Sequence, residues 1–155
     1  MTHRRTILLT CALLPFGGAA HAQSAEVGAL RISNAWTRAA GRGMQGGGFL
    51  TIRNMAAEPD RLLSANSPAA GRLELHTHIR DGDVMRMRPV DDIPIPPNGE
   101  VTLQPGGHHL MLIGLTQAMD VGGSIPVILR FERAGEVTIQ LSIQAAGARA
   151  PAHRH

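Results

Sequence analysis

The sequence predicts an all-β domain, either a sandwich or a barrel. Short runs of β-branched and apolar residues alternate with clusters of Gly, Pro, Asn and Asp, and little of the chain has helical periodicity. One helical turn is expected over residues 116–121. The expected strands are residues 29–37, 49–54, 61–65, 73–79, 84–89, 100–103, 109–113, 125–132 and 136–144.

Residues 1–22 have the features of a cleaved signal peptide. Arg4 and Arg5 precede an apolar stretch, and Ala20-His21-Ala22 forms an A-x-A cleavage site. The stretch is shorter than the ~18 apolar residues of a membrane-spanning helix, and no later segment reaches that length. We therefore expect a periplasmic protein without a membrane span in the mature chain, exported by general secretion or by a twin-arginine signal. Residues 23–144 would form the domain, and residues 145–155 a flexible tail.

The only cysteine, Cys11, lies inside this signal. Lipid attachment at Cys11 is the alternative to its removal, but Thr10 before it and the very short preceding apolar stretch argue against attachment. The mature chain is then expected to contain no thiol and no disulfide, so its stability has to come from the core.

The mature part of the chain is almost neutral. Fifteen basic residues, all of them arginine, face twelve acidic ones. Removing Arg4 and Arg5 with the signal leaves thirteen against twelve. Aromatic residues in the mature chain are limited to Trp36, Phe49 and Phe131, which offers no platform for stacking bases. We expect no binding to nucleic acid.

Four residues form the candidate metal site: His76, Met87, His109 and Met111, spaced H-x10-M-x21-H-x-M. Thioethers are soft ligands that suit Cu(I), and imidazole also binds copper. A blue copper electron-transfer site needs a Cys thiolate, which the mature chain lacks. No catalytic arrangement stands out, so we expect no enzyme. The alternatives are a metal-free adhesion or assembly module of sandwich type and, less favoured, a copper redox enzyme.

A hairpin explains how two of these ligands could meet. Asp81-Gly82 between two alternating runs predicts a two-residue turn of type I′. In that register His76 lies opposite Met87, and His78 lies opposite Met85. Directly paired residues have Cβ atoms about 4.5–5.5 Å apart, so His76 and Met87 could bind one ion. His78 and Met85 would share their face, as solvated residues or as outer ligands.

The other two ligands belong to one strand. His109 and Met111 are two residues apart, so their side chains share a face, while Leu110 and Leu112 point to the core. His108 should point away from His109 and have a structural role. A site formed by this strand and the hairpin would contain two imidazoles and two thioethers.

These spacings resemble those of the PCuAC family of periplasmic copper chaperones, whose signature is H-x10-M-x21-H-x-M. The similarity extends over Ala35-Trp36-Thr37-Arg38 and over residues 48–54, 73–76, 84–87 and 105–112. The resemblance implies a cupredoxin-like Greek-key β-barrel that binds one Cu(I) through the four residues and passes it on. It also implies a copper-accepting partner such as cytochrome c oxidase subunit II, during assembly of the binuclear copper centre, and a Sco-type thiol protein as a second partner.

The remaining histidines and methionines have weaker patterns. His153 and His155 end the chain as H-x-H and could chelate Cu(II) as a secondary site; a solvated tail without function is the equal alternative. Met44 lies in a glycine-rich loop and could cap the main site. Met55 and Met119 are expected to be packing or surface residues.

Overall fold

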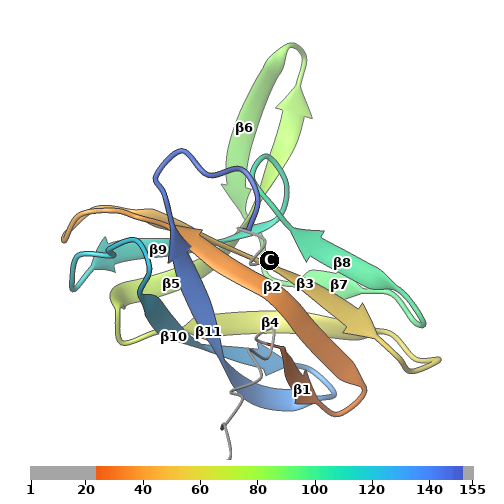
Figure 1. The fold of residues 1–155 in the computed structure, drawn as a ribbon. Coiled ribbons are helices and arrows are strands. Elements are labelled where there is room, and N and C mark those ends of the chain that lie inside the picture. The colour runs from red at the N-terminus through yellow and green to blue at the C-terminus, as the bar shows by residue number, and fades with distance from the viewer. Residues whose placement is uncertain (1–23, 152–155) are drawn as a thin grey trace, which may run out of the picture.

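The computed structural model describes residues 24–151, and all of its regular elements are strands (Figure 1). The expected signal peptide, residues 1–22, lies outside these residues, as do His153 and His155. No helix within residues 24–151 has the length and apolar character needed to cross a membrane. The strands are β1 (Ala25–Val27), β2 (Leu30–Arg38), β3 (Gly46–Asn54), β4 (Asp60–Asn66), β5 (Ala70–Asp81), β6 (Val84–Pro89), β7 (Ile93–Ile95), β8 (Glu100–Leu103), β9 (His109–Leu115), β10 (Ser124–Phe131) and β11 (Gly135–Gln144).

The strands form one sheet in the order β6-β5-β9-β3-β2-β11-β10-β4-β7, with β1 paired to β2 and β8 paired to β3. All pairs are antiparallel except β11 with β2. β4 and β5 are far apart in this order but contact each other, which shows that the sheet curls on itself. The all-β prediction is confirmed, and the fold is cupredoxin-like.

The core lies inside the curled sheet. Side chains that alternate along the strands are fully buried there, among them Ile52, Leu62, Ile93, Leu110 and Leu141. Alternation is the expected pattern for strands with one face on a core and one face on solvent.

Nine strands were predicted, and each is present within a few residues of its expected limits. Two short strands, β1 and β7, were missed. The helical turn expected over residues 116–121 is wrong: bends occur there, and Met119 makes an isolated bridge to Ala40. Met119 is 1 % exposed, so its burial in the core fixes this segment without a helix.

The predicted register of the β5–β6 hairpin is also wrong. The pair Asp81↔Val84 closes the hairpin, so the turn consists of Gly82 and Asp83. Gly82 has a φ of 63°, and a glycine at the first central position is typical of a type II′ turn. As a result His78, and not His76, lies directly opposite Met87. The shift is an even number of residues, so the residues of the ligand face stay on that face.

The β5–β6 hairpin projects beyond the rest of the sheet (Figure 1). β9 pairs with β5 only as far as His76↔His109, whereas β5 continues to Asp81. β6 pairs with β5 alone, and all six of its residues are exposed. This projecting hairpin, residues 77–89, is called the arm below.

The predicted flexible tail begins with an ordered contact. Ala148 N donates to Ala145 O at 2.9 Å, and the Ala148 carbonyl accepts a hydrogen bond from Arg38 Nε at 2.7 Å. The segment after β11 is therefore held against β2 at Ala148.

The two faces of β9 should respond differently to truncation. Leu110→Ala removes a fully buried side chain and should lower the free energy of unfolding by about 2–5 kcal/mol. Met111→Ala, on the half-buried opposite face, should cost no more than about 1 kcal/mol. Urea denaturation of both variants measures the difference; equal losses would contradict the assigned faces.

Candidate metal site

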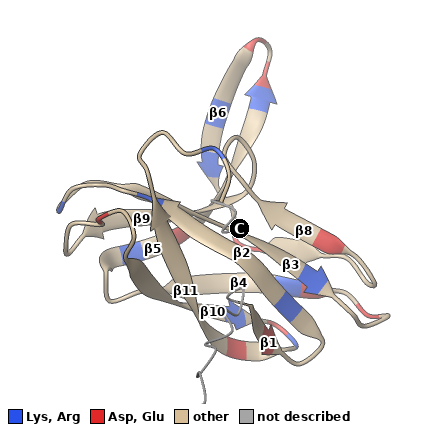
Figure 2. Ribbon diagram, viewed as in Figure 1, with Lys and Arg blue, Asp and Glu red and all other residues tan. Residues whose placement is uncertain are grey.

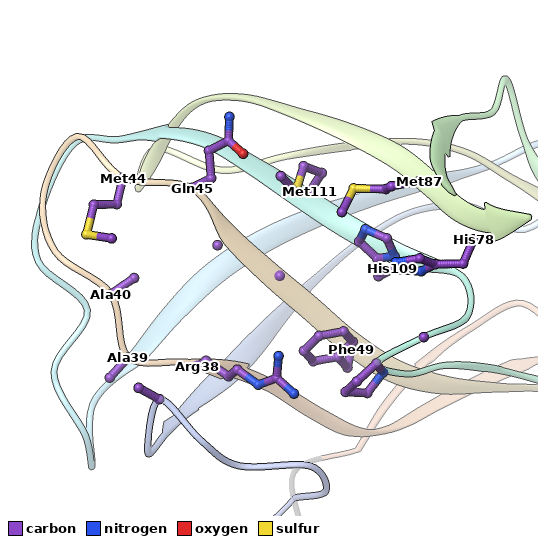
Figure 3. Close-up of a pocket in the computed structure, with 15 residues that line it drawn as sticks. Arg38, Ala39, Ala40, Met44, Gln45, Phe49, His78, Met87, His109 and Met111 are labelled. Carbon is purple, nitrogen blue, oxygen red and sulfur yellow. The ribbon is translucent and has the colours of Figure 1, made fainter. Parts of the chain in front are cut away.

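One end of the curled sheet contains a cavity of about 500 Å³. His78, Met87, His109 and Met111 line it from β5, β6 and β9, and Phe49 lies across from them on β3 (Figure 3). Two segments that are far apart in sequence, the β5–β6 hairpin and β9, therefore contribute nitrogen and sulfur atoms to one space.

Arg38 and Met44 also line the cavity. The sequence suggested Met44 as a cap for the site, whereas it gave Arg38 no role there. The Arg38 guanidinium lies 5.5 Å from the Phe49 ring centroid and 5.9 Å from that of Trp36. Trp36 and Phe49 are themselves 4.6 Å apart and buried. Arg38 and Phe49 of this stack line the cavity, whereas Trp36 packs behind Phe49. Met44, 59 % exposed, lies on the loop at the far end of the cavity.

His109 is the most deeply buried of the candidate ligands, at 4 % exposure. Its Nδ1 donates to the Gly107 carbonyl at 3.0 Å. A neutral imidazole that donates through Nδ1 keeps a lone pair on Nε2 for a metal. Burial lowers the pKa of His109, the hydrogen bond to Gly107 opposes this, and the nearby imidazoles of His78 and His76 lower it further. The ring is thus kept in the neutral form that coordinates.

His76 lies beside His109 and does not line the cavity. The two residues are directly paired between β5 and β9, with ring centroids 5.7 Å apart. His76 Nε2 donates to Glu74 Oε2 at 2.8 Å, and this hydrogen bond is the main cause that lowers the pKa of the Glu74 carboxyl. His76 Nδ1 is buried and has no hydrogen-bond partner.

An unpartnered buried nitrogen is costly, because it has lost its water without gaining a protein partner. A metal ion bound by His76 Nδ1 would remove that cost, and a carboxylate on the other ring nitrogen is a common support for a ligating histidine. The sequence contains the signal for Glu74, since it lies two residues before His76 on the same face of the strand.

The two candidate methionines differ in exposure. Met111 is half-buried next to His109 on β9, whereas Met87 is 45 % exposed on the arm. Met111 pairs with Glu74 on β5, and Met87 pairs with His78. Met85 is on the same face of the arm but does not line the cavity.

Other residues have the positions expected for structural roles. His108 is absent from the cavity wall. Met55 is 60 % exposed and Met119 is in the core. Within residues 24–151 no three His, Cys, Asp or Glu side chains converge on one point. The side chains that line the cavity include imidazoles and thioethers, and such a donor set favours a soft ion.

Fold and site together define a cupredoxin-like domain with nitrogen and sulfur donors at one end. Residues 30–143 match the family described as "LpqE-like: Putative lipoprotein LpqE-like", and the chain belongs to that family. The curated "Putative lipoprotein Lxx21020" of Leifsonia xyli is 35 % identical over 103 residues, which are 66 % of this chain and 61 % of that protein. The chain therefore matches less than two thirds of its relative's length.

Solved structures of PCuAC domains have the same fold. The copper-bound PCuAC domain from PmoF2 has a TM-score of 0.67 at 31 % identity, over 79 % of this chain and 97 % of that one. The apo PCuAC domain from PmoF1 has a TM-score of 0.68 at 28 % identity, over 79 % and 98 %. The Cu(I) form of DR1885 from Deinococcus radiodurans has 0.61 at 26 % identity, over 84 % and 86 %.

Acidification should destabilise the metal-free protein through His109. Its folded pKa lies below the ordinary value of 6.5, so below that pH the unfolded chain binds a proton that the folded protein does not. Stability should therefore fall as pH drops from about 6.5 toward the folded pKa. Urea denaturation at pH 7.5 and 5.5 measures this. His109→Gln should show a smaller loss between the two pH values, and an equal loss would contradict the prediction.

Proposed function

We propose that the protein is a periplasmic copper chaperone that binds one Cu(I) through His76, Met87, His109 and Met111 and passes it to a recipient protein. The observation that carries the proposal is the cavity, where the side chains of Met87, His109 and Met111 meet. The ring of His76, with its unpartnered Nδ1, lies next to that of His109. Copper in the similar domains from PmoF2 and DR1885 supports it.

The donor set favours the reduced ion. Two thioethers and neutral imidazoles suit Cu(I), whereas Mg²⁺, Ca²⁺ and Mn²⁺ prefer oxygen ligands. Met and His also keep their ligand atoms in an oxidising compartment where a thiolate would form a disulfide. His109, buried, and Met111, half-buried, are fixed donors on β9, since strands hold ligands more rigidly than loops do.

Release is proposed to start at the arm. Met87 is the most exposed of the four residues and belongs to a strand with one neighbour. A soft donor from a recipient can approach the ion on that side, so Met87 can leave while His109 still holds copper. Such ligand exchange moves the ion without releasing it to water and requires no change of oxidation state.

The recipient is proposed from the resemblance to PCuAC chaperones. A copper-accepting protein such as cytochrome c oxidase subunit II would receive the ion for its binuclear centre, with a Sco-type thiol protein as a second partner. The cupredoxin-like fold is consistent with a carrier of this kind. No nucleic acid or membrane contact is part of the proposal.

Removing both thioethers should abolish tight Cu(I) binding. A Met87→Ala, Met111→Ala double variant should lose at least about 100-fold in Cu(I) affinity, equivalent to about 2.7 kcal/mol. Competitive titration of the mature protein against a chromophoric Cu(I) chelator gives the affinity and the 1:1 stoichiometry. Met55→Ala is the matched control, because Met55 is exposed and distant from the cavity. Unchanged affinity in the double variant would rule out the assigned ligands.

The tail is proposed as a secondary Cu(II) site. His153 and His155 supply two imidazoles, which bind Cu(II) without thioethers. Truncation after Ala150 should lower the number of Cu(II) ions bound and leave Cu(I) affinity unchanged. Titration with each ion tests this, and an unchanged Cu(II) stoichiometry would show that the tail is not a Cu(II) site.

A further inference from the structure

His78 has the position of a metal ligand, although the H-x10-M-x21-H-x-M motif does not include it. Its side chain lines the cavity with Met87, His109 and Met111. Figure 3 shows His78, His109 and Met87 together at one end of that space. His78 is directly opposite Met87 in the arm, and paired residues have Cβ atoms close enough to bind one ion.

The two imidazoles in the cavity face the same backbone carbonyl. His109 Nδ1 is 3.0 Å from Gly107 O, and His78 Nδ1 is 3.4 Å from the same oxygen. Their ring centroids are 5.2 Å apart. With Nδ1 of both rings directed to Gly107, each Nε2 keeps its lone pair. His78 is therefore prepared for coordination in the same way as His109.

His76 lies two residues before His78 on the same face of β5, nearer the base of the arm, and this position is called the inner side. It is 5.7 Å from His109, ring to ring, and is tied to Glu74 through Nε2. It is absent from the cavity wall. An ion held by His109 thus has one imidazole toward the cavity, His78, and another beside it on the inner side, His76.

The three imidazoles are not arranged to bind one ion together. Among the described residues no group of three His, Cys, Asp or Glu side chains converges on a point. His76 and His78 are therefore alternative partners of His109, and an ion moving between the cavity and the inner position has to exchange one for the other.

We infer that His78 is a transit ligand, which holds copper beside His109 while the ion passes between the cavity and the site that includes His76. The inference rests on the proposed Cu(I) binding. During uptake a bond forms from copper to His78 Nε2 as the donor of the incoming complex leaves. That bond then breaks as copper bonds to His76 Nδ1. The ion stays Cu(I), and no proton moves, because both nitrogens act through lone pairs. Release follows the reverse order.

A ligand used only in transit affects the rates of Cu(I) uptake and release but not the affinity for Cu(I). Uptake and release share one path, so losing His78 should slow both by the same factor. For His78→Ala we expect about tenfold, the effect of about 1.4 kcal/mol on the barrier. The Kd for Cu(I) should stay within about twofold.

Stopped-flow exchange of Cu(I) between the mature protein and bathocuproine disulfonate measures both rates, and competitive titration measures the Kd. His78→Met should restore fast exchange, because a thioether also binds Cu(I). Thr77→Ala is the matched control: Thr77 is the neighbour of His78 on the opposite face of β5, and its variant should exchange like the wild type.

Two results would overturn the transit role alone. Unchanged rates in His78→Ala would make His78 a bystander, and a Kd weakened by the same factor as release is accelerated would make it a resting ligand. A wild-type protein that binds no Cu(I) would overturn the proposed function and the transit role together. Tight wild-type binding with unchanged His78→Ala rates would overturn the transit role alone.

Discussion

The pairing of β5 with β9 is the constraint on which the site depends. Its register places Leu75 opposite Leu110 in the core and His76 opposite His109 on the other face. A slip by one residue would exchange these faces, bury imidazoles and expose leucines. Burying a leucine contributes about 1.5–3 kcal/mol, so the hydrophobic core selects the register. The relative position of the two histidines is therefore fixed by folding and needs no metal.

The arm is held much less firmly than this pair. β6 has a single neighbour and no buried residue, and beyond His76 the arm has no third strand. Segments with few buried contacts open at lower free energy than the core. The site thus joins two rigid donors on β9, His109 and Met111, to Met87 on a projecting hairpin. For the proposed copper carrier this division is suitable, because one donor can withdraw while the others keep the ion in place.

The sequence predicted this fold well because apolar and polar residues alternate visibly along the long strands. β1 and β7 were not predicted because three residues are too few to show a period. Met119 was assigned to a helical turn because its burial comes from contacts distant in sequence. The arm register failed for a local reason: Gly82 can occupy either central position of a two-residue turn, and the chemistry of Asp81-Gly82 does not distinguish the two. The cavity could not be predicted, since Phe49 meets His109 and Gly107 meets His78 only in the folded chain.

An exposed edge strand that carries apolar side chains invites pairing with another copy of the chain. β6 carries arginines, coloured blue in Figure 2, that alternate with Met85 and Met87. Successive side chains of a strand point to opposite faces, so the thioethers occupy the ligand face and the arginines the other. Charged side chains on an edge discourage edge-to-edge pairing, because joining two such strands would bring like charges together. Arg86 also pairs with Asp81 at 3.1 Å across the arm. In the proposed function, the strand can therefore keep a soft donor accessible to a recipient while resisting self-association, which a purely apolar edge could not do.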